Sequence, residues 1–244
     1  MEERKSAMLS TRLRKRMRVL GINTFQAYLE RLEQKGTEVQ EFINLITTNE
    51  TFFFRTTAVW DFFEKEFLPK WRTEKAGQPV RIWSAASSSG AEAYSLAMAC
   101  AEARVEFRIF GSDISTAILA EAKIGEYDGR VAADLEAKRP AWRAKYFEKN
   151  GDTIRFKPLL RPFVEFAPHN LFAAPPKVGH FDFVFLRNVL IYFTEPDQEK
   201  VLAQMAASLS ADGLLALGES ESLSRMNTPF TFVAPLIYRK GDKK

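Results

Sequence analysis

The sequence predicts an α/β fold in which an all-helical segment precedes a doubly wound body built on a parallel sheet. The length of 244 residues suits one large domain with a small additional module better than two equal domains. Up to about residue 70 the apolar residues recur at helical spacing, and beyond residue 80 short apolar strands alternate with amphipathic helices. This alternation indicates that the strands of the body are parallel.

Residues 1–72 are predicted to form an all-helical domain. A first helix carries an apolar stripe, which we expect to pack on the body, at Leu9, Leu13, Met17 and Leu20. A second helix should follow the capping residues at 23–24 and end at Gly36, and a third begins near Glu38. A fourth carries the aromatic residues of the segment 60–67, and the polar run at 73–79 is predicted to be a linker.

Residues 80–244 are predicted to form the second domain. Its main strands are expected at 80–83, 107–110, 181–186 and 214–217, its helices at 90–102, 116–123 and 196–209, and one or two further strands at 229–238. Three short strands at 146–147, 153–156 and 164–166 break this rhythm, and the Asn150-Gly151 turn and prolines join them. We therefore predict a small antiparallel β-subdomain inserted over about residues 146–168.

Composition excludes several classes of protein. Hydrophobic residues make up 46% and charged residues 27%, which is ordinary for a folded soluble protein. No stretch approaches the roughly 20 apolar residues of a membrane span, and the first residues lack the apolar core of a secretory signal, so a cytoplasmic protein is expected. With Cys100, His169 and His180 as the only cysteine and histidines, neither an internal disulfide nor a zinc cluster is expected.

The positive charge is concentrated at the N-terminus. Residues 1–20 hold seven basic and two acidic residues, a local net charge of +5 against +4 for the whole chain. A basic helix can bind a nucleic acid, an anionic membrane surface or an acidic protein, and it can also be a solvated face without a partner. Charge by itself does not choose among these.

The ends of the first two predicted strands indicate a nucleotide-like ligand. Ligands of open α/β sheets bind beyond the carboxyl ends of the strands. A run of small residues at 84–90 follows the first strand and leads into a helix, and Asp113 follows the second strand, 23 residues beyond Gly90. This spacing is close to the one at which an acid binds a ribose hydroxyl, so we predict an adenosine ligand. The alternative is that Asp113 only caps the next helix.

Two later strand ends carry asparagines. Asn170 follows one short strand and Asn188 another, and an amide side chain can both donate to and accept from adenine. Each could equally be a turn or cap residue. His169 lacks a partner pattern for catalysis or metal binding, so a structural role is predicted, and Cys100 is expected to be a small buried apolar residue.

Three strings resemble signature segments of the CheR family of chemotaxis receptor methyltransferases, which act on protein glutamates. They run from Ile46 to Arg55 (ITTNETFFFR), from Ile82 to Ala97, and from Arg187 to Phe193 (RNVLIYF). Two shorter strings, at 112–115 and 218–223, also match, so the resemblance spans roughly residues 5–240. It implies a Rossmann-like body that binds S-adenosylmethionine as methyl donor and releases S-adenosylhomocysteine, with an N-terminal helical lobe and an inserted β-subdomain.

The resemblance also implies roles for individual residues. Contacts with the donor would come from Asn49, Thr51, Arg55, Glu92, Asp113, Asn170, Leu171, Arg187 and Asn188. In this set Asp113 would bind the ribose and Glu92 would lie near the amino group. Arg55 and Tyr192 match the two catalytic positions closest to the transferred methyl group. No general base is needed, because a glutamate carboxylate is already ionised at neutral pH and a sulfonium is an activated electrophile.

The expected acceptors are glutamates on the helical cytoplasmic domains of chemoreceptors. The basic N-terminal helix, with Arg12, Lys15 and Arg16, is the predicted contact for these acidic helices. Only six residues separate the strand at 146–147 from Ile154, a shorter loop than in relatives that bind a receptor's C-terminal pentapeptide, so binding independent of that peptide is expected. Neither nucleic acid binding nor membrane insertion is expected, and a monomer is predicted.

The sequence departs from the family pattern in places, and other functions stay open. Ala91 and Ala93 flank a single acid where the family usually has two acids and a proline, and Glu219 replaces a more usual histidine. The family commonly has one further helix before the point where this chain begins. The alternatives are an inactive homologue that senses donor or product, a methyltransferase of small molecules, and a nicotinamide-dependent oxidoreductase. The single glycine of the loop disfavours the last.

Overall fold

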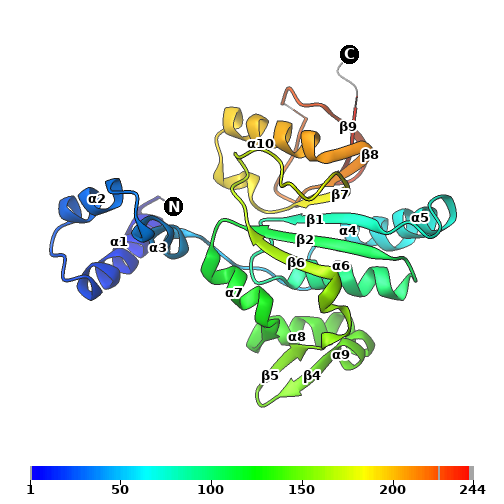
Figure 1. Ribbon diagram of the computed structural model, residues 1–244, viewed down its shortest axis with the longest axis horizontal. Helices are drawn as coiled ribbons and strands as arrows, with labels where there is room; N and C mark the ends of the chain where they lie inside the picture. Colours follow the sequence, from blue (N-terminus) through cyan, green and yellow to red (C-terminus); the bar gives the residue numbers. More distant parts are fainter. Residues whose placement is uncertain (1, 225, 242–244) are drawn as a thin grey trace.

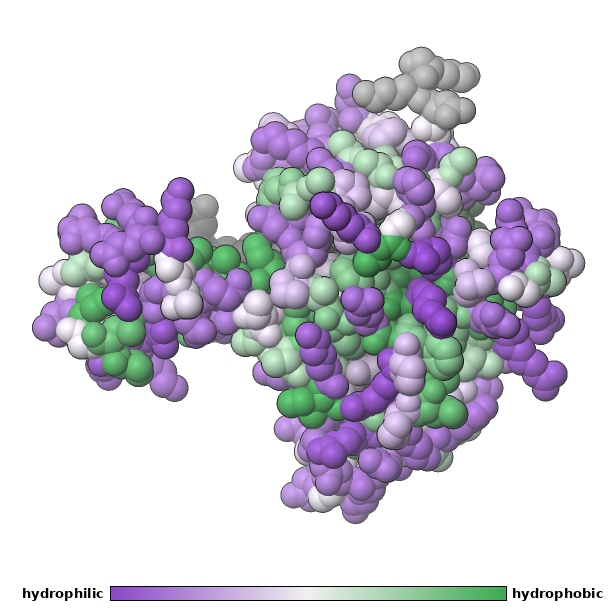
Figure 2. All heavy atoms as spheres, viewed as in Figure 1, coloured by the Kyte–Doolittle hydropathy of each residue, from purple (hydrophilic) through white to green (hydrophobic). Residues whose placement is uncertain are grey.

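The computed structural model describes residues 2–224 and 226–241. Three helices, α1 (Glu2–Val19), α2 (Phe25–Glu33) and α3 (Thr37–Ile46), form a small lobe. Figure 1 shows this lobe at one side of a larger α/β body, to which the extended segment 47–56 connects it. In the space-filling view of Figure 2 a narrow neck joins the two parts, and hydrophilic side chains cover most of the lobe.

A buried ion pair holds the lobe together. Glu38 of α3 is 5% exposed and accepts hydrogen bonds from Arg16 Nε and Nη2 of α1, at 2.9 and 2.7 Å, and from the Tyr28 hydroxyl of α2, at 2.9 Å. The bonds from Arg16 lower the pKa of Glu38, whereas burial and the bond to Glu38 raise the pKa of Tyr28 to about 12. The first helix was expected to pack on the body, but its buried residue Met17 and its contacts with α3 lie within the lobe.

The next three helical segments belong to the body. They are α4 (Thr57–Phe62), the π-helical turn η1 (Phe63–Phe67) and α5 (Leu68–Glu74). The ring of Phe63 lies 5.7 Å from that of Phe183 and 5.5 Å from that of Phe185, both on a central strand. The predicted helical domain of residues 1–72 therefore divides in the structure, because periodicity reveals an apolar face but not the surface on which it packs.

The body is a seven-stranded sheet. Its order is β6-β2-β1-β7-β8-β10-β9, formed by β1 (Val80–Ala85), β2 (Phe107–Asp113), β6 (Val164–Pro168), β7 (Phe181–Leu186), β8 (Leu209–Ala216), β9 (Phe230–Ala234) and β10 (Ile237–Lys240). The five strands from β6 to β8 are parallel, and β10 pairs antiparallel with both β8 and β9. The predicted doubly wound body is confirmed.

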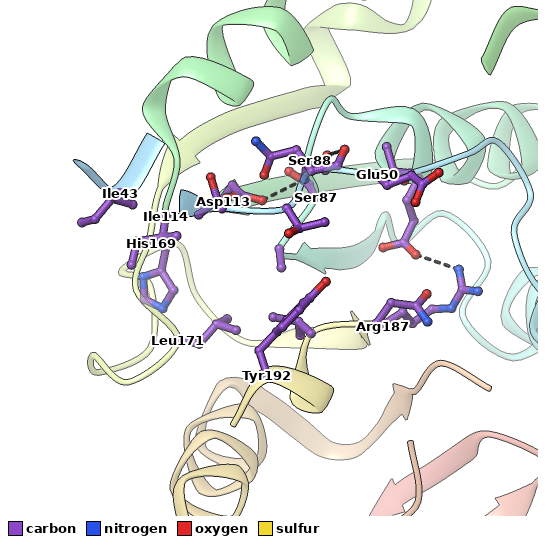
Figure 3. Close-up of a pocket in the computed structure, with 18 of the residues that line it drawn as sticks. Ile43, Glu50, Ser87, Ser88, Asp113, Ile114, His169, Leu171, Arg187 and Tyr192 are labelled. Carbon is purple, nitrogen blue, oxygen red and sulfur yellow. Dashed lines mark hydrogen bonds and ion pairs between the residues drawn. The ribbon is translucent and has the colours of Figure 1, made fainter. Parts of the chain in front are cut away.

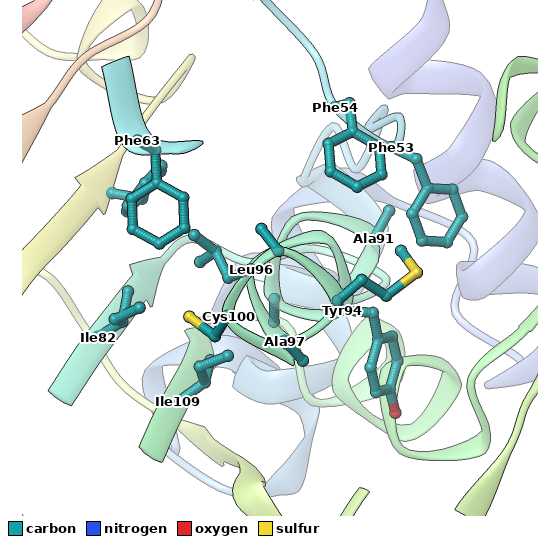
Figure 4. Close-up of a cluster of buried hydrophobic side chains, with 14 of the residues drawn as sticks. Phe53, Phe54, Phe63, Ile82, Ala91, Tyr94, Leu96, Ala97, Cys100 and Ile109 are labelled. Carbon is teal, nitrogen blue, oxygen red and sulfur yellow. The ribbon is translucent and has the colours of Figure 1, made fainter. Parts of the chain in front are cut away.

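Helices cover both faces of the sheet. On one face lie α6 (Ala91–Glu102) and α7 (Thr116–Ile124), together with the aromatic side chains of η1. On the other face lies α10 (Glu195–Ser208), whose buried side chains pack on β7 and β8. Figure 4 shows Leu96, Ala97 and Cys100 of α6 above Ile82 and Ile109 of the sheet. Burial raises the pKa of the Cys100 thiol, which agrees with its predicted role as a small apolar side chain.

The predicted antiparallel insert is confirmed, and two of its three predicted strands are observed, but its third strand comes from an earlier part of the sequence. Its strands are β3 (Glu126–Tyr127), β5 (Thr153–Phe156) and β4 (Phe147–Asn150), and α8 (Gly129–Lys138) and α9 (Pro140–Tyr146) lie between β3 and β4. The strand predicted at 164–166 is observed as β6, but its assignment to the insert was wrong, because β6, which follows the 3₁₀ turn η2 (Pro158–Phe163), pairs parallel with β2 at the edge of the main sheet. The ring of Phe166 fills the space above Gly111, where a Cβ would lie 2.5 Å from it.

None of the helices among the described residues combines the length and the apolar character needed to cross a membrane.

Candidate active site

A cavity of about 490 Å³ lies at the carboxyl ends of β1, β2, β6 and β7, next to the segment 47–56. This is where open α/β sheets bind their ligands. All ten predicted site residues line it: Asn49, Thr51, Arg55, Glu92, Asp113, Asn170, Leu171, Arg187, Asn188 and Tyr192. The lobe contributes to the same wall through Ile43 and Ile46. Figure 3 shows Asp113, Leu171, Arg187 and Tyr192 around the cavity, which five separate segments of the chain enclose.

The loop after β1 is a tight turn of small residues. Ala86, Ser88 and Gly90 all have a positive φ, at 61°, 51° and 83°. At Gly90 a Cβ would lie 2.9 Å from the ring of Phe166, so this position combines a left-handed backbone with a close approach. The turn leads into the N-terminus of α6, where free backbone N–H groups favour an electronegative ligand.

Asp113 connects this loop to the end of β2. Its carboxylate is 7% exposed and accepts the backbone N–H groups of Ser88 and Ser115, both at 3.0 Å. Burial raises the pKa of Asp113, and the two backbone bonds partly oppose the shift. The alternative role as a helix cap was wrong, because Ser115 is the N-cap of α7 and its side chain accepts from Ile118 N. Each oxygen of Asp113 keeps a lone pair for a hydroxyl in the cavity.

Glu92 and Arg187 form a buried ion pair in the cavity wall. Arg187 Nη1 donates to Glu92 Oε2 at 2.8 Å, the bond drawn as a dashed line at Arg187 in Figure 3. Ser84 Oγ donates to Glu92 Oε1, also at 2.8 Å. Arg187 Nη2 also donates to the carbonyl oxygen of Arg55, at 2.5 Å. Among the described residues the buried Nε of Arg187 has no hydrogen-bond partner. The pair therefore ties α6 and the end of β7 to the backbone of the segment that carries Arg55.

The backbone around Arg55 is strained and firmly held. Phe54 and Thr56, on either side of it, have φ values of 49° and 67°, in a region that bulky and β-branched residues rarely adopt. Such conformations cost about 1–3 kcal/mol each and persist only where the surroundings fix them. Here Trp60 Nε1 donates to the Arg55 carbonyl oxygen at 2.9 Å, and Lys138 Nζ of α8 donates to that of Phe53 at 3.0 Å. These contacts therefore fix the backbone from which the Arg55 side chain extends.

The remaining predicted residues occupy the rest of the cavity wall. The Asn49 carbonyl oxygen accepts from Ser88 Oγ at 2.7 Å, which joins the segment 47–56 to the loop after β1. Asn170 accepts from Phe172 N at 3.0 Å, so the turn role left open for it is observed, and it also faces the cavity. Tyr192 is the last residue of the 3₁₀ turn η3 (Leu190–Tyr192) and is 53% exposed.

Two residues contribute to the cavity wall in ways that the sequence did not predict. Glu221 is 6% exposed and binds the backbone of the turn that carries Asn188, although it lies in a string that was singled out without a role. His169 also lines the cavity, with its ring 5.3 Å from that of Trp83, and burial lowers its pKa, which favours the neutral form. Its contacts agree with the predicted structural role.

Together these features define a class of protein. A doubly wound sheet, a small-residue turn after the first strand and a buried acid after the second are typical of proteins that bind an adenosine-containing ligand. The matching family descriptions are "CheR methyltransferase, SAM binding domain" over residues 49–237 and "CheR methyltransferase, all-alpha domain" over residues 1–47. The chain belongs to the CheR methyltransferase family, and the predicted donor, S-adenosylmethionine, is confirmed.

Curated relatives match nearly the whole chain. Chemotaxis protein methyltransferase 1 of Pseudomonas aeruginosa is 36% identical over 96% of this chain and 90% of its own length. The chemotaxis protein methyltransferase of Escherichia coli (strain K12) is also 36% identical, over 97% of this chain and 83% of its own length. Among solved structures, the SAM-bound amino pentose methyltransferase CalS10 of Micromonospora echinaspora is 15% identical with a TM-score of 0.38, over 80% of this chain and 56% of that chain.

Proposed function

We propose that the protein transfers a methyl group from S-adenosylmethionine to glutamate side chains of methyl-accepting chemotaxis proteins, in their cytoplasmic helical domains. The products are glutamate methyl esters and S-adenosylhomocysteine. The observation that supports this most is the presence of both Arg55 and Tyr192 in the wall of one cavity with Asp113 and Glu92. A cation beside a donor site suits an acceptor that is an anion.

Each side chain has a part in this proposal. Asp113 accepts hydrogen bonds from the ribose hydroxyls. Glu92, which Arg187 and Ser84 hold in place, provides a negative charge for the donor's ammonium group. Asn170 and Asn188 face the remaining nucleoside, with Leu171 as an apolar contact, and Asn49 and Thr51 line the methionine side. The bound donor supplies an activated methyl group on a sulfonium.

Transfer then depends on alignment. The guanidinium of Arg55 holds the acceptor carboxylate, and the Tyr192 hydroxyl orients the methyl group at the mouth of the cavity. One carboxylate oxygen forms the new bond to carbon as the carbon–sulfur bond breaks, and its electron pair stays on sulfur. No proton moves, so the side chains contribute chiefly to orientation, which can supply about 7–11 kcal/mol.

The basic helix α1 is the proposed contact for acidic receptor helices. The residues available for this contact differ from those predicted. Arg12 donates to the carbonyl oxygen of Leu45 at the end of α3, and Arg16 is paired with Glu38, so both have structural roles. Among the side chains of this helix whose exposure the structure describes, the exposed cations are Arg14, Lys15 and Arg18. A groove lined by Arg12, Lys15 and Arg16 shares Thr47 and Asn49 with the donor cavity. Charge on α1 therefore lies along one approach to the site.

Recognition is proposed to be independent of a receptor C-terminal pentapeptide. The supporting observation is the short connection between β4 and β5, where Asn150 pairs directly with Thr153 across a turn with Gly151 at a φ of 62°. In the competing function the protein is a regulatory homologue that binds donor or product without turnover. That function would assign no role to Arg55 and Tyr192.

Transfer of a tritiated methyl group to purified receptor fragments tests the proposal. Glutamate methyl esters hydrolyse in base, so the label should be released as volatile methanol after base treatment. Label that stays on the protein would indicate methylation of nitrogen or carbon. Tight binding of the donor with no transfer to any receptor fragment would favour the regulatory alternative.

A further inference from the structure

Glu221 lies outside the donor cavity but binds the backbone that forms part of its wall. The residue follows β8 and is 6% exposed. Its Oε1 accepts from the backbone N–H groups of Val189 and Leu190, both at 2.8 Å. Its Oε2 accepts from those of Asn188, at 2.9 Å, and Gly218, at 2.6 Å. One buried side chain thus gathers four backbone donors from two segments that follow neighbouring strands.

This arrangement requires a carboxylate. All four partners of Glu221 are donors, and a carboxylate offers about four acceptor sites on its two oxygens. A glutamine of the same shape keeps one oxygen, and its NH₂ group would face two N–H donors that it cannot accept. The substitution Glu221→Gln therefore leaves two buried N–H groups unpaired, which destabilises the present arrangement of the two segments.

The backbone that Glu221 binds carries two predicted site residues. Asn188 has a φ of 58°, in the left-handed region where asparagine is enriched, and its side chain lies over Gly218. A Cβ at Gly218 would come within 2.6 Å of Asn188 Nδ2, so the two strand ends are in direct contact. The turn continues through Tyr192 N, which donates to the Val189 carbonyl oxygen at 3.1 Å. Asn188 and Tyr192 both line the cavity.

We infer that Glu221 is a positioning residue for methyl transfer, which fixes the turn 188–192 so that Asn188 meets the donor and Tyr192 meets the methyl group. This inference rests on the proposed function for the role of Tyr192 and only on donor binding for that of Asn188. If the Glu221 carboxylate only stabilised the fold, its replacement would lower the thermal stability without a specific effect on donor binding or on methyl transfer.

The test compares Glu221→Gln with a matched control, Asp182→Asn. Asp182 is a partly buried carboxylate at the opposite end of β7, and it accepts from Arg81 N at 2.9 Å. Three quantities are measured for both variants: the thermal midpoint, the donor dissociation constant by calorimetry, and the rate of transfer to receptor fragments at saturating donor. Glu221→Gln should weaken donor binding about tenfold or more and also lower the saturated rate, because two charge-assisted bonds to the turn are lost.

Asp182→Asn should lower the thermal midpoint while donor affinity and rate stay within about twofold of wild type. The inference is overturned if Glu221→Gln binds donor and turns over like wild type, or if Asp182→Asn loses affinity and rate to the same extent. Should Glu221→Gln fail to fold, Glu221→Asp keeps the charge but shortens the reach, and the same comparison applies. Donor affinity needs no acceptor, so it tests Glu221 even if the proposed acceptor is wrong.

Discussion

At the scale of single residues, Asp113 is the clearest link between sequence pattern and site. It was predicted from its place after the second strand, its spacing from Gly90 and the family resemblance, and the structure places it in the cavity wall with its two oxygens bound to Ser88 N and Ser115 N. Replacing Asp113 with asparagine should weaken donor binding at least about tenfold, because a charged acceptor for a ribose hydroxyl is lost. Calorimetry with the donor measures this, and unchanged affinity in a folded variant would remove Asp113 from the site.

Arg55 should act on the rate rather than on the fold. Its backbone carbonyl is held by Trp60 and Arg187 whatever the side chain, so Arg55→Ala should fold normally. We expect a loss of transfer rate of about 100-fold, and Arg55→Lys should recover little of it, because a lysine lacks the planar fork that binds a carboxylate through two bonds. Rates at saturating donor check this, with thermal midpoints as the control. A lysine variant with the wild-type rate would show that charge alone suffices.

At the scale of elements, sequence periodicity predicted most helices and strands of the body but not their partners. The strand at 164–166 was found and then assigned to the wrong sheet, because a short edge strand has the same alternation in either place. The two-residue strand β3 carries no periodic signal at all. The helices at 57–74 were recognised as helical, but only the contacts of Phe63 and Phe67 with Phe183 reveal that they belong to the body.

The ion pair in the lobe gives a prediction about pH. Arg16 lowers the pKa of Glu38 below its ordinary value of 4.5, so the pair stabilises the lobe above the unfolded pKa, and this stability is lost as pH falls through the folded pKa. Glu38→Gln should destabilise the lobe by about 2 kcal/mol at pH 7. It should also make the stability of the lobe less dependent on pH below 4.5. Thermal unfolding followed by helical circular dichroism tests this. Parallel pH curves for both proteins would contradict it.

At the scale of the whole molecule, the donor cavity depends on parts of the chain that are distant in sequence. The lobe supplies Ile43 and Ile46, the segment 47–56 supplies Asn49, Thr51 and Arg55, and most of the other residues follow four strand ends. Most of the predicted site residues were located because the family strings coincide with segments that meet at the cavity, whereas the contribution of Ile43 was not predicted. It could not show that Arg12 and Arg16 are bound within the lobe, because charge pattern does not reveal ion pairs between helices.

The exposed charge of α1 should control association with receptors. Replacing Lys15 and Arg18 with alanine should slow methylation of receptor fragments several-fold at low salt and reduce its salt dependence, because exposed charges steer association. Donor affinity should be unchanged. The matched control replaces Lys70 and Lys75, exposed cations near α5 on the far side of the body from the lobe in Figure 1. An equal effect in both variants would show that net charge matters and the position of α1 does not.

The proposed acceptors of the methyl group are glutamate carboxylates on receptor helices. Peptide mapping by mass spectrometry, after incubation of the protein with donor and a receptor cytoplasmic fragment, tests this most directly. We predict a methyl group on glutamate side chains of acidic helices, absent when those glutamates are replaced by alanine and removed by mild base. Methylation at lysine or at a peptide terminus, or a receptor fragment left unmodified while the donor is consumed on another substrate, would contradict the account.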